Sequence, residues 1–439
     1  MPRRRVVVTG VGVVSPVGND VGTFHRNLME GRSGVGFIQG FSTEKLRSDI
    51  AAQVLDFDPL RFLTRKESEI YGRVTHFSVG AMAEAMTMAG IAEVPRAVAA
   101  IDAEVDVEET SPIVGSDGVD RTRMGCLMST GMGSVDIFEQ EVAKSAARGP
   151  RAVSPFFIPG VMPNGGAALA TMRWGLMGPS YSMASACATG AHSISTSAMM
   201  IEAGDVDVML AGGAEAAIRQ NCVAGFGNAR ALARAFEGDP TRSSRPFDKK
   251  RTGFVMGEGA GALVLEEEQH ALRRGATPLA YVSGFGMTSD AAHLTRPHAK
   301  GLGLAMAMER AIARAGITPG DVGYLNPHAT STPQGDVAEY VALQRVFGDR
   351  LKSIPISATK SMIGHLLGGA AAVEAIATIL ALRDQRVHPS INVDELDEAF
   401  DLDVVRGGPR KLDFRYALKG SAGFGGHNCA LLLERYEGP

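Results

Sequence analysis

Three sequence patterns in the first half of the chain recur in the same order in the second half. Each consists of a strand-like run next to glycines or small residues. The pairs are residues 6–12 with 279–286, the segment around Cys187 with that around Lys360, and the glycine-rich stretch ending at Glu266 with that ending at Glu434.

Strand-like runs alternate with helical runs in each repeat. This alternation predicts mainly parallel sheets with helices on both faces. The helices that follow Cys187 and Lys360 are rich in small residues, which favours burial on two sides. We therefore expect an α/β fold of two duplicated halves, residues 1–270 and 271–439, with these helices between two sheets.

The bulk properties of the chain limit its function classes. Its 439 residues are 45% hydrophobic and 21% charged, as in ordinary globular proteins. The net charge of -4 disfavours nucleic acid and membrane surfaces as partners. No apolar run is long enough to span a bilayer, and the N-terminus does not resemble a signal peptide. The four cysteines have no paired spacing, which disfavours disulfides and metal sites and favours a cytoplasmic location.

Two glycine-rich stretches have features of nucleotide-binding motifs, but both motifs are incomplete. Residues 5–12 predict a strand and a glycine turn, yet Ser15 stands where a dinucleotide fingerprint needs its third glycine. The stretch beginning at Gly253 lacks the Gly-Lys-Ser/Thr of a phosphate loop. Glycines that allow tight backbone packing are the simpler interpretation of the second stretch.

Cys187 is the first candidate for chemistry. Strand-like alternation over residues 180–186 leads into it, and a helical run over 188–203 follows and ends at Gly204. A thiol at a helix start meets unpaired backbone N–H groups and the positive end of the helix dipole, which favour the nucleophilic thiolate. A buried structural cysteine is the alternative, but only small residues flank Cys187, which leaves room for a substrate.

The second half adds ionisable side chains just past its predicted strands. His328 and His365 each lie in such a position. Lys360 and Glu374 flank an apolar helix, where a buried charge needs a partner, so each is expected to serve the other directly or through His365.

These groups together favour carbon–carbon bond formation between two thioesters. A thiolate accepts an acyl group from a thioester, and two neutral imidazoles aimed at one oxygen stabilise an enolate. The backbone N–H groups of Cys187 and Phe424 would stabilise the tetrahedral intermediate at the thiol. Simple hydrolysis needs only one of the histidines.

The motifs in combination resemble those of the elongating, type II β-ketoacyl-[acyl-carrier-protein] synthases, which belong to the thiolase-like condensing enzymes. The resemblance covers nearly the whole chain, apart from residues 95–122. It implies a five-layer αβαβα fold, a homodimer and a decarboxylative Claisen condensation. The motifs that carry it are Ser-Ala-Cys187-Ala-Thr-Gly, Asn-Pro-His328-Ala-Thr-Ser-Thr, Lys360-Ser-Met-Ile-Gly-His365 and Gly-Phe424-Gly-Gly.

The resemblance also implies a role for each reactive residue. Cys187 would take the growing acyl chain from an acyl carrier protein. His328 and His365 would hold the thioester carbonyl of malonyl carrier protein while carbon dioxide leaves, and Lys360 and Glu374 would order His365. It implies no cofactor apart from the phosphopantetheine arm of the carrier. No residue is assigned to a metal, and whether a structural metal ion binds stays open.

Further contacts follow from the same resemblance. It places the phosphopantetheine arm at Thr330 and Thr332, a gate at Phe424, the acyl pocket at Met132, Phe157 and Phe226, and basic contacts for the carrier at Arg65, Lys66, Arg151 and Arg230.

Several positions depart from the family pattern. Ala329 stands where glycine is usual, Ala422 replaces an aromatic residue that commonly precedes the glycine loop, and Glu69 and Ile70 stand where basic carrier contacts are usual. Residues 95–122 are acidic, rich in turn formers and longer than the family norm, which predicts an exposed insertion loop. The acyl length and the identity of the carrier therefore stay open.

Two alternatives also stay open. The same chemistry in a dedicated polyketide or specialised lipid pathway fits Ala422, Glu69 and the acidic insertion. A non-catalytic partner of a condensing enzyme is the other alternative, although such a partner has no need for Cys187 and both histidines together.

Overall fold

The two halves of the chain build β-sheets with the same strand order. The computed structural model describes residues 4–91 and 114–438. In pairing order, the first sheet consists of β1 (Val6–Val14), β7 (Gly259–Glu267), β6 (Val208–Glu215), β4 (Met124–Thr130) and β5 (Ser180–Tyr181). The second consists of β8 (Ala280–Ser289), β15 (His427–Arg435), β14 (Tyr416–Gly423), β9 (Val322–Asn326), β10 (Pro355–Ile356) and β12 (Asp403–Val404).

The pairing directions of the two sheets agree as well. In each half the last long strand pairs antiparallel with both of its neighbours, β7 in the first half and β15 in the second. The remaining pairs are parallel. This equivalence confirms the duplication expected from the sequence.

The two sheets meet at their first strands. Val7 of β1 pairs with Tyr281 of β8, and Val8 pairs with Ala280, which makes one hydrogen-bonded sheet of 11 strands. The short helix α9 (Glu268–Arg273) lies in the connection between β7 and β8.

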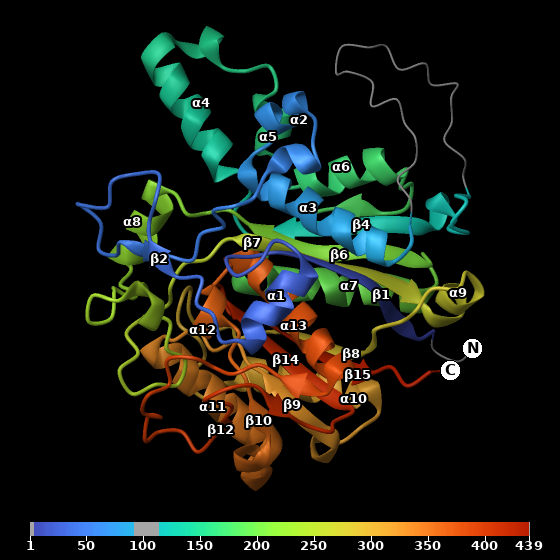
Figure 1. Ribbon diagram of the computed structural model, residues 1–439, viewed down its shortest axis with the longest axis vertical. Helices are drawn as coiled ribbons and strands as arrows, with labels where there is room; N and C mark the ends of the chain where they lie inside the picture. Colours follow the sequence, from blue (N-terminus) through green and yellow to red (C-terminus); the bar gives the residue numbers. More distant parts are fainter. Residues whose placement is uncertain (1–3, 92–113, 439) are drawn as a thin grey trace.

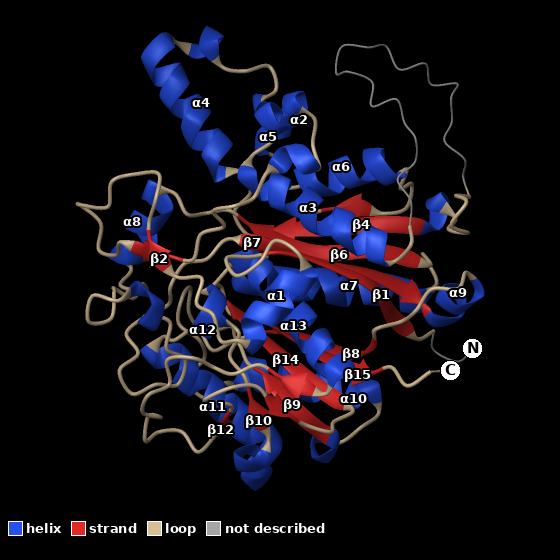
Figure 2. Ribbon diagram, in the orientation of Figure 1, coloured by secondary structure: helices blue, strands red, loops and turns tan. Residues whose placement is uncertain are grey.

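The helices complete five layers (Figures 1 and 2). α3 (Arg73–Met88) and α6 (Gly165–Trp174) cover the outer face of the first sheet, while α10 (Leu302–Ala315) and α11 (Pro333–Phe347) cover that of the second. α7 (Thr189–Ala203) and α13 (Ala370–Asp384) lie between the sheets. Their many small residues allow burial on both sides, and the predicted αβαβα architecture is confirmed.

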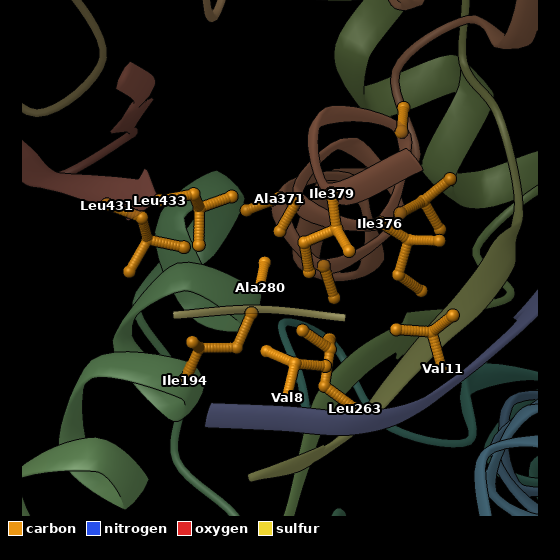
Figure 3. Packing of buried hydrophobic residues seen from close by; sticks show 14 of the residues in the cluster. Val8, Val11, Ile194, Leu263, Ala280, Ala371, Ile376, Ile379, Leu431 and Leu433 are labelled. Carbon is orange, nitrogen blue, oxygen red and sulfur yellow. The ribbon is translucent and has the colours of Figure 1, made fainter. Parts of the chain in front are cut away.

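The central helices and both sheets share one hydrophobic core. Figure 3 shows Ile194 of α7 and Ile376 of α13 close to Val8 and Leu263 of the first sheet and Leu431 of the second. All of these side chains are buried. The core therefore fixes the start of α7, where Cys187 lies, relative to loops of the other half.

Glycines in the two first strands serve helix packing. Gly10 lies inside β1, and a Cβ there would come within 2.1 Å of the carbonyl oxygen of Ala85 in α3. Likewise, a Cβ on Gly284 of β8 would come within 2.1 Å of the carbonyl oxygen of Ala311 in α10. The glycine turn expected after residue 8 is wrong, because both glycines continue the strand and let a helix approach its backbone.

A group of helices extends beyond the outer layer of the first half (Figure 1). It contains α2 (Arg65–Ile70), α4 (Val135–Arg148) and α5 (Phe157–Val161). The extended backbone of Tyr71 and Gly72 separates α2 from α3. Asp136 of α4 accepts a hydrogen bond from the Arg73 N–H at 2.8 Å and so satisfies one of the free N–H groups at the start of α3.

The remaining elements are short and lie in connecting segments. They are α1 (Val21–Met29), β2 (Gly36–Phe37), β3 (Ile50–Ala51), α8 (Gln220–Asn228), α12 (Lys360–Ile363), β11 (Arg386–Val387) and β13 (Arg410–Lys411). Within residues 4–91 and 114–438, no helix combines the length and hydropathy needed to cross a bilayer.

Most of the predicted acidic insertion, residues 95–113, lies outside the described residues. Its described end is only partly the exposed loop that was expected: Val114, Ser116 and Gly118 are exposed, but other residues are buried. Asp117 and Arg121 form a buried ion pair at 2.6 Å, and Val119 is buried beside them. Pairing of the two charges permits this burial.

Candidate active site

Cys187 lies in a 3₁₀ turn, Ala186–Ala188, directly before α7. The strand before it is shorter than predicted, because β5 ends at Tyr181. Ala186 adopts a left-handed backbone conformation with φ of 49°. The Thr189 hydroxyl secures the turn by accepting from the Ser185 N–H at 2.9 Å and donating to the Ala186 carbonyl at 2.7 Å. This turn directs the thiol into a cavity.

The predicted activation of the Cys187 thiol by the helix start needs correction. The residue is 9% exposed, and burial raises the pKa of its thiol to about 11. The backbone N–H of Phe424 and the charge of Lys360 act in the opposite direction without outweighing desolvation. The thiol therefore keeps its proton at neutral pH and must lose it during attack.

Two backbone N–H groups converge on the Cys187 sulfur. They belong to Phe424 and to Cys187 itself, the pair predicted to stabilise an oxyanion. Glycine is required beside them, since a Cβ on Gly423 would lie 3.0 Å from the Cys187 nitrogen and 2.8 Å from the Ser185 oxygen. The end of β14 thus brings an amide from the second half against the thiol of the first.

His328 and His365 lie side by side in the same cavity. Their ring centroids are 5.3 Å apart with the planes at 88°, and Phe254 packs edge-on against His365. Neither ring nitrogen of His365 has a hydrogen-bond partner among the described residues. Burial, followed by the positive charge of Lys360, lowers the pKa of both imidazoles well below 6.5. They are neutral at physiological pH and each offers one N–H donor.

Lys360 and Glu374 form the ion pair that the sequence predicted. Both are buried, and neither lines the cavity. The lysine therefore acts on the imidazole of His365 through its charge and not through a hydrogen bond to either ring nitrogen. The Glu374 carboxylate also binds a second lysine, Lys419, at 2.9 Å.

Lys419 was missed by sequence reasoning. It lies fully buried in β14, donates to the Gly420 carbonyl, and contributes to the low pKa of both imidazoles. A lysine inside an otherwise small and apolar strand is the signal that could have identified it, since a buried lysine needs a partner.

Replacing Lys419 with methionine should shift the acidic side of the pH–rate profile of malonyl decarboxylation to higher pH. A nearby positive charge disfavours the imidazolium, so its removal raises the pKa of His328 and His365 toward 6.5. The rate at pH 6 should fall relative to that at pH 8, whereas Lys419→Arg should retain the original profile. Identical pH profiles for the methionine variant and the unsubstituted protein would contradict this electrostatic role.

Two further buried carboxylates, also missed, hold loops of the site. Glu339 of α11 accepts hydrogen bonds from the N–H groups of His328 at 2.6 Å and Ala329 at 2.7 Å. These bonds stabilise a loop in which Ala329 has a positive φ of 33°, where glycine is usual in the family. Burial raises the pKa of Glu339.

Glu215 of β6 joins the two halves beneath the thiol. Its carboxylate accepts from the Thr130 hydroxyl at 2.8 Å and from the N–H groups of Gly131, Met132 and Gly368 at 3.1–3.2 Å. Burial raises its pKa to about 7. Its polar partners come from residues far away in the sequence, so no local pattern predicts this contact.

The cavity around Cys187 has a volume of about 700 Å³. The predicted site residues that line it are Cys187, His328, His365, Phe424, Thr330, Thr332, Met132, Phe226 and Arg230. Phe226 lies against Phe424, with centroids 6.2 Å apart, and the hydroxyls of Thr330 and Thr332 are 3.1 Å apart.

Phe157 does not line this cavity within the described chain. It lies at the start of α5 and packs against Phe138 of α4, with ring centroids 6.3 Å apart. Within a single chain, Phe157 therefore does not reach the acyl pocket predicted for it, because α4 and α5 extend away from Cys187.

The other predicted carrier contacts lie outside the cavity. Arg65 and Arg151 are exposed, and Lys66 has its ammonium 6.0 Å from the ring centroid of Phe156. All three belong to the protruding group of helices and its connections. Arg230, by contrast, is an exposed residue of the cavity lining.

Known proteins share both this fold and this sequence. The structure superposes with a TM-score of 0.88 on a type II polyketide ketosynthase in complex with its acyl-carrier protein, which is 28% identical and covered over 99% of this chain and 100% of that one. The ishigamide ketosynthase/chain length factor gives a TM-score of 0.87 at 32% identity, over 99% of this chain and 100% of that one.

Sequence comparison places the chain in a family. Residues 3–271 match the N-terminal domain of β-ketoacyl synthases, and residues 279–394 match the C-terminal domain. A 3-oxoacyl-[acyl-carrier-protein] synthase 2 of Vibrio harveyi is 41% identical over 436 residues, which cover 99% of each chain. The chain belongs to the β-ketoacyl synthase family of condensing enzymes, as its motifs predicted.

Proposed function

We propose that this protein elongates a fatty acyl chain by decarboxylative condensation with malonyl-[acyl-carrier-protein]. The observation that carries the proposal is the convergence of one thiol, two amide donors and two neutral imidazoles in one cavity. The name of the Vibrio harveyi relative, a 3-oxoacyl-[acyl-carrier-protein] synthase 2, supports the same reaction.

In the first step, the Cys187 sulfur attacks the thioester carbonyl of the acyl carrier protein. The oxygen takes up negative charge and receives the N–H groups of Cys187 and Phe424. The carbon–sulfur bond to the carrier then breaks, and the carrier thiol leaves with a proton derived from Cys187. The product is an acyl thioester on Cys187.

In the second step, the malonyl thioester places its carbonyl oxygen at His328 and His365. The bond to the carboxylate breaks, carbon dioxide leaves, and the electron pair forms an enolate that the two imidazole N–H groups stabilise. The enolate carbon attacks the acyl carbonyl, the bond to Cys187 breaks, and the thiolate regains a proton. Burial, together with the charges of Lys360 and Lys419, keeps the imidazoles neutral, so that no further positive charge is added beside the lysines.

An acyl carrier protein is the proposed partner. The superposed polyketide ketosynthase is in complex with one, and Arg65, Lys66, Arg151 and Arg230 are the proposed contacts. The phosphopantetheine arm would run past Thr330 and Thr332 at the cavity entrance. We propose no resident cofactor, since the arm presents both reactive thioesters.

We also propose a homodimer. The exposed apolar side chains Phe138, Val142 and Ile158 lie on α4 and α5 and are 53%, 51% and 59% exposed. Exposed apolar patches commonly mark interfaces. Among the described residues, no strand pairs with the outer edge of β5, which ends the sheet on the same half of the molecule. Coverage by a second copy would bury both features.

The variant Phe138→Asp/Val142→Asp should be monomeric. Charges at an apolar interface leave buried carboxylates without partners. Sedimentation velocity should show a dimer for the unsubstituted chain and a monomer for this variant. Leu55→Asp, which places a charge on a residue that is 59% exposed elsewhere, should remain dimeric. A dimer that tolerates both aspartates on α4 would contradict the proposed interface.

The reaction is tested by incubating the purified protein with acyl- and malonyl-carrier protein. The proposal expects one β-ketoacyl product and one carbon dioxide per turnover. Failure to form the product would refute the proposed activity. A dedicated polyketide or specialised lipid pathway would instead be favoured if a carrier of primary fatty-acid synthesis were a poor substrate and a dedicated carrier a good one.

A further inference from the structure

The cavity extends into a recess on the outer face of β14. Side chains alternate along this strand. Lys419 faces the central helices, where it binds Glu374 of α13, and Gly420 faces the opposite way. A Cβ on Gly420 would point at Met308 and Leu304 of α10 and at the Glu339 carboxylate of α11. By the same alternation, Ala422 faces α10 and α11.

The recess exists because the outward position of β14 next to the glycine loop, Ala422, is small. Ala422 contributes only a methyl group to the cavity wall, whereas a Cβ added at Gly420 would already contact Met308, Glu339 and Leu304 at 3.4–3.9 Å. The other walls of the recess are Gly301, Leu304 and Ala338, all of which are buried and line the cavity. These walls are apolar and favour a small apolar group, although the Glu339 carboxylate also lines the cavity nearby.

The recess lies close to the reacting atoms. Ala422 directly precedes Gly423, whose Cα faces the backbone nitrogen of Cys187. Glu339, which also lines the cavity, binds the backbone of His328. The recess is therefore on the outer side of the second sheet, near the loop that carries His328. Met132 lies instead in the loop after β4 of the first sheet, where it lines the same cavity.

We propose that this recess accepts a substituent on C2 of the extender, so that the enzyme condenses 2-substituted malonyl thioesters carrying a methyl or ethyl group. The inference rests on the proposed function, because it assumes that the extender carbonyl lies between His328 and His365. C2 is bonded directly to that carbonyl carbon. A substituent on C2 is thus the part of the extender nearest to Ala422, whereas the acyl chain on Cys187 extends toward Met132.

The chemistry balances in the same way as for malonyl. The bond from C2 to its carboxylate breaks, carbon dioxide leaves, and the electron pair forms a substituted enolate. C2 then bonds to the acyl carbonyl carbon while the carbon–sulfur bond to Cys187 breaks and the thiolate takes up a proton. The product is a 2-substituted 3-ketoacyl thioester.

Competition between malonyl- and methylmalonyl-carrier protein, with products measured by mass spectrometry, tests the proposal. The unsubstituted enzyme should form the methyl-branched product. Ala422→Phe should lower the ratio of branched to linear product about 10- to 100-fold, the usual discrimination against an extra methyl group in a filled pocket. Ala338→Leu, which fills the recess from α11, should lower the same ratio and decides the question if Ala422→Phe does not fold.

Met132→Phe is the matched variant in the loop after β4. It should shorten the accepted acyl chain and leave the branched-to-linear ratio unchanged. Linear product without branched product from the unsubstituted enzyme would overturn the inference, as would a ratio unaffected by filling the recess. Absence of any product with malonyl would refute the proposed function instead.

Discussion

Replacing Cys187 with alanine should lower condensation by about 10⁴-fold or more, as expected for loss of a nucleophile. The acyl chain then has no sulfur to bond to. Decarboxylation of malonyl carrier protein should persist, because His328 and His365 still offer their N–H groups to the enolate. Product formation and carbon dioxide release, measured in parallel, separate the two steps.

Cys222→Ala is the matched control for Cys187→Ala. Cys222 is a partly exposed free cysteine in α8 and does not line the cavity. This variant should retain condensation. β-Ketoacyl product from the Cys187→Ala protein would show that no covalent intermediate on this residue is required.

Replacing His365 with alanine should lower malonyl decarboxylation by about 10²- to 10³-fold, the usual cost of removing one oxyanion donor. The ring has no other hydrogen-bond partner among the described residues, so its nitrogens are available to the substrate. His365→Asn retains an N–H donor and should keep more activity than alanine. The rate of carbon dioxide release with excess malonyl carrier protein measures the effect.

His25→Ala provides the control for this second prediction. His25 lies in α1, away from the cavity, beside Asp384 at 3.4 Å. Its removal should leave decarboxylation unchanged. Decarboxylation at the full rate in His365→Ala would show that this imidazole does not stabilise the enolate.

The duplicated fold could be predicted because its signals are local and repeated. Small residues after Cys187 and Lys360 mark the two helices that lie between the sheets. Because equivalent motifs recur in both halves, the histidines of the second half could be expected to face the thiol of the first. Glycines gave a less reliable signal: the sequence around Gly10 is compatible with a turn, and only the approach of α3 explains why the strand continues.

The electrostatics of the site could not be predicted in the same way. The helix start at Cys187 is visible in the sequence, but the degree of burial, which raises the pKa of the thiol, depends on the whole fold. Glu215 and Glu339 bind backbone N–H groups in loops that follow other strands. Such contacts have no sequence pattern, since any buried carboxylate near a loop can make them.

Some of the predicted site residues lie on surfaces that stay exposed in a single chain. Phe157 packs on α4 rather than in the cavity, and Met132 is 41% exposed although it lines the cavity. A single sequence does not specify which surface covers them. The variants on α4 test this part of the proposal independently of the chemistry.

Intact-mass spectrometry during a single turnover tests the central claim most directly. Acyl-carrier protein alone should add one acyl group, mapped to Cys187, and malonyl-carrier protein should then remove it as β-ketoacyl product is formed. This sequence of events requires the thiol of the first half and the histidines of the second to act on the same substrate. An acyl group that malonyl-carrier protein does not discharge, or product without any adduct on Cys187, would contradict the account.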